Sequence, residues 1–385
     1  MKTQSSYSDI NTSRILRLIW QRKLISRVEI ASVLGLDKST VTKIVNELKE
    51  LGLLRETIQG KTGPLGGRPP VFLEITPEFA CVGGIEITPG RVVCCLLNLH
   101  GDIIFEDRQS ITTDEFLKMH IKGVFSKACH TIQKRADELG IKLVGIGLGL
   151  PGLLNSSRGE IEYSLPLMIQ TPFSLKEQLE EVTDIPVEIE NDARCCCYSE
   201  MISSQSTAVN NMIFVLTEYR AYKPAENSKK NLAVGFGIVL DSELLKGRDE
   251  TAGEFRSMLW EEGTVGQFHS GDGNLSEKLE ENSEMRSVFM ELARHIAFLV
   301  NTLNLQTVCI GGMEPKYIKV LQKYVHERIE IQWSYTNERQ IDVRMSTYDD
   351  LAVAHGAGSM YLTKIFSIPE AKPEKVPVSA HLLNL

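Results

Sequence analysis

The chain has 385 residues, which is enough for two or three domains that each bury a sizeable core. Residues 1–76 carry 12 basic and 7 acidic residues, whereas the remainder carries 30 and 43, so the net charge of −8 is divided very unevenly. This asymmetry favours a nucleic-acid-binding head on an acidic body. No apolar run reaches the length of a membrane span, and the polar N-terminus does not look like a secretory signal. We therefore expect a cytoplasmic protein that has no membrane partner.

The eight cysteines include two runs, Cys94–Cys95 and Cys195–Cys197. Adjacent cysteines are poor disulfide partners, and a reducing cytoplasm is the simplest setting for them. We expect most of these thiols to serve in core packing.

The first elements are helical. Residues 1–11 predict no ordered element, and a first helix is expected to start with Thr12 or Ser13 as its cap. A second helix is expected over Arg27–Leu34, with Ile30, Val33 and Leu34 on one face. Gly35 would then provide a turn that needs a positive φ.

The next helix starts after Asp37, a good N-cap. Its apolar side chains recur at helical spacing and are expected to face inward: Val41, Ile44, Val45, Leu48 and Leu51. The residues left outside are polar, and we predict that they contact DNA: Lys38, Ser39, Thr40, Lys43 and Asn46. A helix with such a face can enter a major groove. The alternative is a helical hairpin that only packs on a larger domain.

Two strands, Leu53–Glu56 and Val71–Glu74, flank a loop rich in glycine and proline. This pattern predicts a wing whose tip carries Lys61 and Arg68, which would contact the minor groove or phosphates. A flexible linker is the alternative.

The rest of the chain alternates strands with helices. The expected strands are Cys81–Ile87, Arg91–Leu99, Asp102–Arg108, Leu143–Gly149, Val187–Glu190, Met212–Leu216, Leu232–Leu240, Val308–Ile310 and Ile341–Met345. The expected helices are Asp114–Leu139, Ser174–Glu181, Glu284–Leu303 and Leu351–Tyr361, with a further helix after Asp192. A polar excursion is expected over Thr217–Lys230. Strands that end in glycine or aspartate turns and lead into helices indicate an α/β architecture, here repeated in two similar halves.

Several short motifs occur in a characteristic order: GGRPP, GLGLPG, the Glu190-Asn191-Asp192 turn, TAGE, CIGG and AHGAGSMYL. In this order the chain resembles the ROK family, which comprises sugar kinases and winged-helix transcriptional repressors on a shared actin-like, two-lobed sugar-kinase fold. The head is typical of the repressor branch. The resemblance implies a winged helix-turn-helix domain over residues 1–76, a first lobe over 77–200 and a second over 201–385, with the C-terminal helix packing back on the first lobe.

The resemblance also implies a sugar site. Asp192 matches the catalytic base of the kinases and Asn191 matches a residue that hydrogen-bonds the sugar, while Glu254 and Ser164 complete the expected pocket. Carboxylates and amides suit a ligand rich in hydroxyl groups. Alternatively, the Asn-Asp pair is only a turn that caps a helix, and the carboxylates are a solvated rim.

The phosphate-binding turn departs from the family pattern. Glu86, Thr88 and Pro89 replace an aspartate and two glycines, and Pro89 removes a backbone N–H that a phosphate would need. The glycines that persist in the nucleotide-side turns are weak signs of ATP: Gly235, Gly237, Gly311 and Gly312. We therefore expect neither ATP nor magnesium as a cofactor, no catalytic residues, and Asp192 as a vestigial base.

The zinc site of the family is also incomplete. Ser257 stands where a histidine ligand belongs, and no cysteine occurs between Cys197 and Cys309, although His269 remains nearby. We expect no zinc.

The resulting hypothesis is a sugar-responsive regulator that acts as a repressor and responds to a small carbohydrate effector. It would bind a palindromic double-stranded DNA operator as a homodimer or higher homo-oligomer. The alternatives are an active sugar kinase with Asp192 as base and a DNA-binding protein that senses no ligand.

Overall fold

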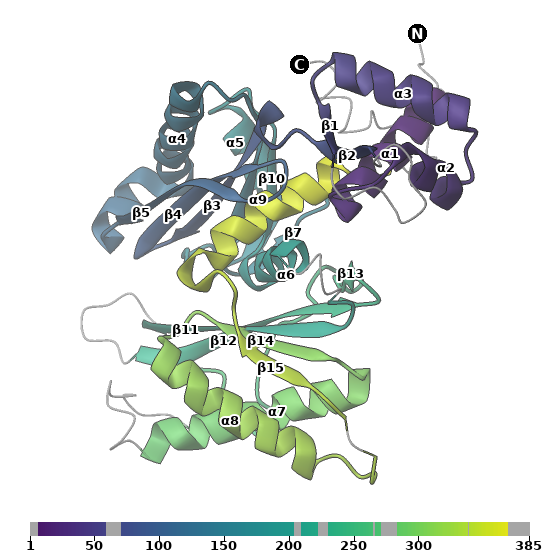
Figure 1. The fold of residues 1–385 in the computed structure, drawn as a ribbon. Helices are drawn as coiled ribbons and strands as arrows, with labels where there is room; N and C mark the ends of the chain where they lie inside the picture. Colours follow the sequence, from purple (N-terminus) through teal and green to yellow (C-terminus); the bar gives the residue numbers. More distant parts are fainter. Residues whose placement is uncertain are drawn as a thin grey trace.

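The computed structural model describes residues 7–58, 71–203, 209–221, 230–264, 266–270, 283–337 and 339–368. A small head of helices sits beside the first of two α/β lobes, and the second lobe lies on the other side of two central helices (Figure 1). The boundaries predicted for these domains stay predictions. No helix of the described residues is long and apolar enough to cross a membrane.

The head is a helix-turn-helix followed by a hairpin. Its elements are α1 (Tyr7–Arg22), α2 (Arg27–Leu34), α3 (Lys38–Glu50), β1 (Leu54–Ile58) and β2 (Val71–Ile75). The two strands pair antiparallel, as expected for the base of a wing. Lys61 and Arg68 lie outside the described residues, so their predicted contacts stay predictions.

Local chemistry sets the limits of α2. The hydroxyl of Ser26 accepts a hydrogen bond from the Glu29 N–H at 3.3 Å, and the Glu29 carboxylate accepts one from the Ser26 N–H at 2.8 Å. This capping box satisfies two otherwise unpaired donors at the start of the helix. Gly35 ends the helix with a φ of 64°, which confirms the expected turn.

Three details of the predicted head are wrong. Helix α1 begins at Tyr7, well before the expected cap at Thr12 or Ser13. Val33 is 56% exposed, because the buried side of the short α2 is formed by Ile30 and Ala31, with Leu34 packed against the core. Leu51 is 50% exposed because it forms the C-cap of α3, beyond the last turn that packs inward.

The first lobe is built on a five-stranded sheet in the order β10-β6-β3-β4-β5. Its strands are β3 (Cys81–Thr88), β4 (Arg91–Asn98), β5 (Ile103–Ser110), β6 (Leu143–Leu150) and β10 (Val187–Asn191), its helices are α4 (Thr113–Leu139) and α5 (Leu175–Glu180), and a small sheet comprises β7 (Leu153–Asn155), β8 (Glu160–Tyr163) and β9 (Phe173–Ser174). The first three strands are antiparallel, and β6 and β10 continue the sheet in parallel.

The second lobe repeats this topology, which confirms the two similar halves. Its sheet has the order β13-β12-β11-β14-β15, with antiparallel pairing on one side of β11 and parallel pairing on the other. Its elements are β11 (Met212–Ala221), β12 (Lys230–Leu240), β13 (Glu243–Leu244), α7 (Ser283–Leu303), β14 (Thr307–Gly311), α8 (Pro315–Ile331) and β15 (Asp342–Met345).

Sequence reasoning missed α8, although a signal was present. Pro315 occupies its first turn, and buried apolar side chains recur at helical spacing: Tyr317, Ile318, Leu321, Val325 and Ile329. The polar excursion expected over Thr217–Lys230 is also shorter than predicted. Strand β11 continues to Ala221, which pairs with Lys230 of β12.

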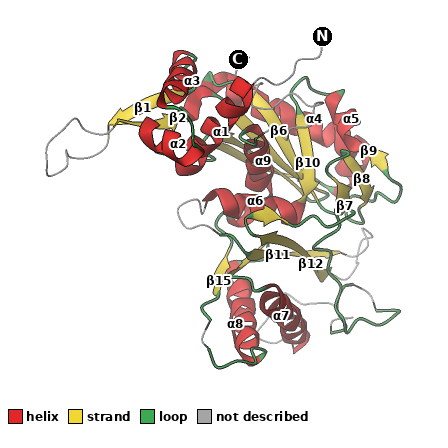
Figure 2. Ribbon diagram, turned by 90° about the vertical axis from the view of Figure 1, so that its right-hand side faces the viewer, coloured by secondary structure: helices red, strands yellow, loops and turns green. Residues whose placement is uncertain are grey.

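Two helices lie between the sheets, α6 (Asp192–Ser203) and α9 (Ala352–Ile365), and the two views agree on this placement (Figures 1 and 2). Close approach of α9 to the first sheet depends on glycine, because a Cβ on Gly84 would lie 1.9 Å from the carbonyl oxygen of Ala354. All eight cysteines are buried, in agreement with the packing role expected for them.

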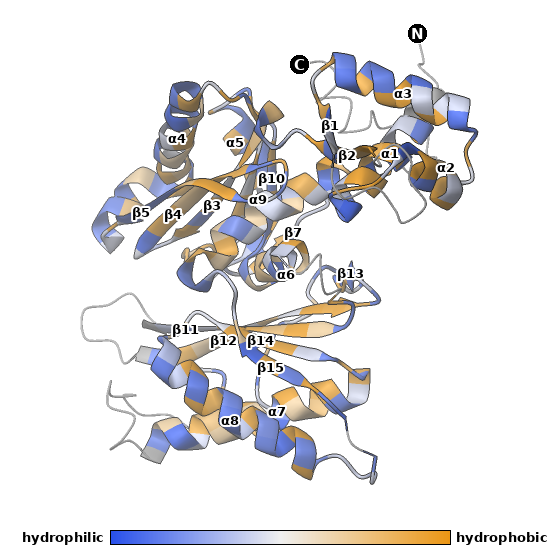
Figure 3. Cartoon of the chain, in the orientation of Figure 1, coloured by the Kyte–Doolittle hydropathy of each residue, from blue (hydrophilic) through white to orange (hydrophobic). Residues whose placement is uncertain are grey.

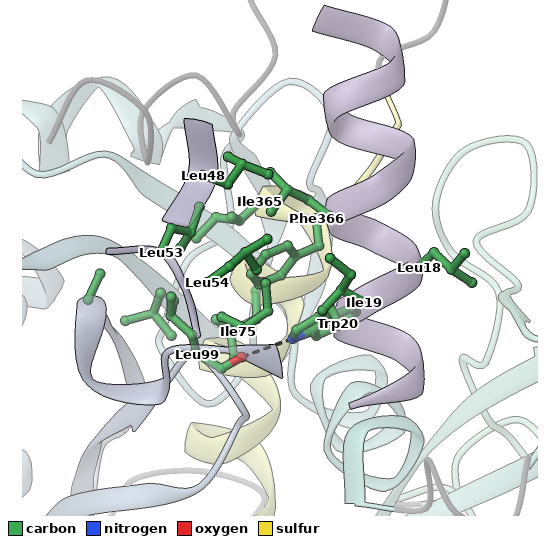
Figure 4. Close-up of a cluster of buried hydrophobic side chains, with 14 of the residues drawn as sticks. Leu18, Ile19, Trp20, Leu48, Leu53, Leu54, Ile75, Leu99, Ile365 and Phe366 are labelled. Atoms are coloured by element: carbon green, nitrogen blue, oxygen red, sulfur yellow. Dashed lines mark hydrogen bonds between the residues drawn. The ribbon is translucent and has the colours of Figure 1, made fainter. Parts of the chain in front are cut away.

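The core of the head is continuous with the core of the first lobe and α9. The Trp20 ring of α1 stacks on Phe366, just after α9, with ring centroids 4.9 Å apart. Its indole N–H donates to the carbonyl oxygen of Leu99 at 2.9 Å (Figure 4). Head, first lobe and C-terminal helix therefore share one apolar interior.

A buried histidine helps to hold α9 in position. One ring nitrogen of His355 lies 3.0 Å from the Gly101 carbonyl oxygen, the other lies 2.9 Å from the Ser199 hydroxyl, and the ring stacks on Tyr348. Burial lowers the pKa of His355 to about 4.

We expect this histidine to make the protein acid-sensitive. As pH falls from about 6.5 to about 4, the unfolded chain binds a proton at this position that the folded chain does not, so folding is disfavoured by roughly 3 kcal/mol. Urea unfolding of the wild type and of His355→Gln across this pH range would measure the effect. The wild type should lose stability relative to the variant on acidification, and parallel pH profiles would contradict the assignment.

Candidate DNA interface and ligand cleft

Helix α3 presents a polar face to solvent. Val41, Ile44, Val45 and Leu48 are buried in the head. The predicted DNA-contacting residues lie on the other side, with Thr40 half-buried and the others exposed: Lys38, Ser39, Lys43 and Asn46. Figure 3 shows this division as hydrophilic and hydrophobic stretches along the helix. The geometry is that of a helix able to enter a major groove.

Ion pairs on the head orient part of this face. Arg27 donates to Asn46 Oδ1 at 3.4 Å and lies 2.8 Å from a carboxylate oxygen of Glu56, which also pairs with Lys49 at 2.8 Å. Hydrogen bonds from Lys49 and Arg27 hold the pKa of Glu56 below its usual range. Arg27 and Lys49 were missed by sequence reasoning, because their link to the wing depends on tertiary contacts.

Replacing Lys43 by alanine is expected to weaken DNA binding about tenfold, because one charged contact worth about 1–3 kcal/mol is lost. If Lys43 contacts a phosphate, the dependence of log affinity on log salt should also fall by about one. Fluorescence anisotropy with operator DNA measures both quantities. Lys323→Ala, an exposed lysine on α8 of the second lobe, is the matched control and should leave binding unchanged; equal losses in the two variants would contradict the interface.

The predicted sugar residues are only partly brought together. Asn191, at the end of β10, donates to the Gly152 carbonyl oxygen at 3.1 Å, and Asp192 Oδ1 accepts from the Ala193 N–H at 2.8 Å. Glu254 is exposed on the second lobe and pairs through its backbone with Gly235. Asn191 and Glu254 face one small void, whereas Asp192 lines a separate, larger cleft.

Ser164 does not reach this site. It is fully buried, donates to the Pro151 carbonyl oxygen at 2.6 Å and accepts from the Leu167 N–H at 3.3 Å. Its hydroxyl is thus engaged by backbone groups in this structure, and its predicted sugar contact stays a prediction.

A buried ion pair occupies the space beside Asn191. Arg194 is 2% exposed and its Nε lies 2.7 Å from Oε1 of the fully buried Glu190. The same guanidinium donates to the backbone carbonyl of Glu250, in the second lobe. Lys246, also in the second lobe, places its ammonium 3.1 Å from the other oxygen of Glu190. This charge network joins the two lobes.

The network leaves little room for a sugar. The void lined by Asn191, Arg194, Glu250 and Glu254 has a volume of about 10 Å³, which is at most the space needed by one water. In this arrangement the Arg194 side chain stands where a ligand of Asn191 and Glu254 would be expected. Sequence reasoning missed this residue, although a charged side chain in a run of small, buried residues was a signal.

A much larger cleft of about 610 Å³ opens between the lobes, beside Asp192. Thr88 and Pro89 line it at the end of β3, together with Glu86, which Arg91 pairs at 2.8 Å. Burial raises the pKa of Glu86 to about 7, and Arg91 offsets only part of this effect. Glu86 stands where the resemblance places a metal-binding carboxylate, and in this structure it forms an ion pair with Arg91 instead.

The four glycines expected as relics of a nucleotide site have packing roles here. A Cβ on Gly235 or Gly237 would meet Ala193 of α6, and one on Gly237 would also lie 2.3 Å from the Cys197 sulfur. A Cβ on Gly311 would meet Phe214, and Gly312 adopts a φ of 94° beside the Thr217 carbonyl oxygen. Only Gly312 lines the large cleft.

The residues at the family's zinc position do not fit that metal. The buried Ser257 hydroxyl lies 3.0 Å from a ring nitrogen of His295, and the Glu291 carboxylate accepts the backbone N–H groups of His269 and Ser270 at 2.9 Å. No thiolate is available, because the chain has no cysteine between Cys197 and Cys309. Across the described part of the chain, no three acidic, histidine or cysteine side chains gather as a metal site.

Known proteins share this architecture. A winged helix-turn-helix DNA-binding model matches residues 8–55, and a ROK family model matches residues 82–265. The xylose repressor of Caldicellulosiruptor bescii is 23% identical over 418 aligned residues, which cover 96% of this chain and 100% of that protein.

Solved structures agree on the fold. A ROK family transcriptional regulator described as a homologue of the Escherichia coli Mlc protein aligns with a TM-score of 0.68 and 20% identity, over 92% of this chain and 96% of that chain. A ROK family glucokinase from Streptomyces griseus, solved with glucose and AMPPNP, aligns with a TM-score of 0.55 and 15% identity, over 73% of this chain and 99% of that chain.

Head and body together define a class of protein, a winged helix-turn-helix DNA-binding domain joined to a two-lobed, actin-like sugar-kinase fold. Within that class, the chain carries a ROK family domain over residues 82–265 and, ahead of it, a winged helix-turn-helix DNA-binding domain over residues 8–55.

Proposed function

We propose that this chain is a sugar-responsive transcriptional regulator that represses genes of carbohydrate use. It would bind a palindromic operator as a homodimer, with one α3 in each of two successive major grooves. The observation that carries the proposal is the polar, exposed face of α3 on a head whose core continues into the first lobe and α9. The named repressor function of the xylose repressor relative supports it.

Helix α9 supplies the link between ligand and DNA. Ala352 and Val353, at its start, line the large cleft, whereas Ile365 and Phe366, at its end, join the apolar cluster of the head. A ligand that favours one arrangement of the lobes would move this helix and with it the head. The spacing of two heads in a dimer would then change, and so would the fit to the operator.

Several features argue against phosphoryl transfer as the activity. Pro89 offers no N–H to a phosphate, the Glu86 carboxylate is engaged by Arg91, and the remaining glycines are explained by packing. We therefore propose a body without kinase activity, in which Asp192 is no longer a base, and without ATP, magnesium or zinc as cofactor.

The test is a fluorescence-anisotropy titration of the protein with its own upstream intergenic DNA, at two salt concentrations and with a panel of sugars. Tight, salt-sensitive binding that one sugar releases is the expected result. Absence of sequence-specific binding at low salt would overturn the proposal. Binding that no sugar alters would show a regulator that senses no ligand, in keeping with the void filled by Arg194, and turnover of ATP with a hexose, lost in Asp192→Asn, would show a kinase.

A further inference from the structure

The cleft of about 610 Å³ between the lobes has an excess of carboxylates, although Arg91 pairs with Glu86 and Arg108 with Asp350, and its volume suits a small molecule. Among the described residues that line it, the carboxylates outnumber the cations, since Arg91 is the one basic side chain and the acidic ones are Glu86, Asp192, Glu218, Asp349 and Asp350. They come from both lobes and from the segment that leads into α9. A ligand with several negative charges would be repelled here.

Two buried acceptors that line this cleft have no hydrogen-bond donor among the described residues. Glu86 is 4% exposed, and its Oε2 makes no hydrogen bond to any described residue, although its Oε1 is paired with Arg91. On the opposite lobe, the Oδ1 of Asn231 is also buried and makes no hydrogen bond to a described residue. Buried acceptors without partners are rare and costly, so they point to a ligand that donates hydrogen bonds.

The kind of donor follows from the charges. Glu86 Oε2 needs a hydrogen-bond donor. A nucleotide phosphate brings only acceptors and negative charge, so it does not meet this need. A dedicated metal ion is also disfavoured, because the acidic side chains in the described residues do not gather as a set of three ligands. An ammonium group meets both demands, since it carries positive charge and three donors.

We propose that the interlobe cleft binds an amino sugar in its ammonium form, with Glu86 as the carboxylate that accepts from the amine and Asn231 as the acceptor for a ring hydroxyl. The proposal rests on the proposed function and names the class of its effector. The sugar ring would lie against the apolar walls, which Leu216, Tyr219 and Leu232 provide. Because the two acceptors belong to different lobes, the ligand would bridge them and favour one lobe arrangement at the start of α9.

The experiment is calorimetric titration of the full chain at pH 7 and low salt with glucosamine, galactosamine and mannosamine, each beside its parent hexose and its N-acetyl derivative. At least one amine should bind at least tenfold tighter than its two neutral counterparts. Glu86→Gln should abolish this preference, whereas Asn231→Ala should weaken the amine and the parent hexose alike. Glu177→Gln, an exposed carboxylate on α5, is the control and should bind as the wild type does.

The inference is overturned if no amine binds at millimolar concentration, if a neutral counterpart binds as tightly, or if Glu86→Gln keeps the preference while its melting curve shows a folded protein. Anisotropy with operator DNA separates this failure from that of the proposed function. If a neutral sugar releases the DNA, the proposed regulator function is supported and the amino-sugar inference is refuted. If an amine binds in the cleft without changing the affinity for DNA, the amino-sugar site is supported and its role in regulation is refuted.

Discussion

Replacing Arg194 by alanine is expected to destabilise the protein by about 3–5 kcal/mol, because the fully buried Glu190 then loses its ion-pair partner at 2.7 Å. The Glu250 carbonyl in the second lobe would lose a donor at the same time. Lys246 cannot compensate fully, since its side chain is 35% exposed and its ammonium pairs with the other carboxylate oxygen of Glu190. Urea unfolding at pH 7, followed by circular dichroism, measures the change.

Two further variants separate charge from packing. The double variant Arg194→Met with Glu190→Gln removes both charges and should be clearly more stable than Arg194→Ala. Arg158→Ala removes an arginine that is 61% exposed and pairs with Glu160 at 2.6 Å, so it should cost less than about 1 kcal/mol. If Arg194→Ala also loses less than 1 kcal/mol, the network does not join the lobes in solution.

The second large effect is expected at Trp20. Its change to alanine removes a ring that is 8% exposed and stacks on Phe366, at an expected cost of about 3–5 kcal/mol. The Leu99 carbonyl would also lose its donor. Since these contacts join the head to the body, calorimetry should show that the single unfolding transition of the wild type separates into two in the variant. A ligand that releases the wild type from DNA should no longer release the variant.

A graded series tests this coupling. Trp20→Phe keeps a stacking ring but loses the indole N–H and part of the buried ring, so it should cost about 1–3 kcal/mol and keep part of the ligand response. Val33→Ala, at a position of the same head that is 56% exposed, should change stability by less than about 0.5 kcal/mol. A single transition and an unchanged ligand response in Trp20→Ala would show that the head and body are coupled by another route.

The sequence by itself determined the local elements and their order. Helical spacing of Val41, Ile44, Val45 and Leu48 identifies the buried side of α3 and so its polar side, because this periodicity depends only on the geometry of one helix. The α/β character and its repetition in two similar halves also follow from alternating patterns along the chain, whereas the order of strands within each sheet comes from the structure. Errors arose at the ends of elements, as at Leu51, where the last turn decides what is buried.

Tertiary structure alone decided which distant residues meet. The stacking of Trp20 on Phe366 and the approach of Arg194 to Glu250 depend on how separately folded units are docked, and no spacing along the chain encodes this. For the same reason, the hydrogen bonds of the Ser164 hydroxyl to the backbone of Pro151 and Leu167 could not be predicted from its position in the sequence. The ion pair beside the small void is completed only once the two lobes face each other. The same holds for the large cleft, where two acceptors have no partner among the described residues.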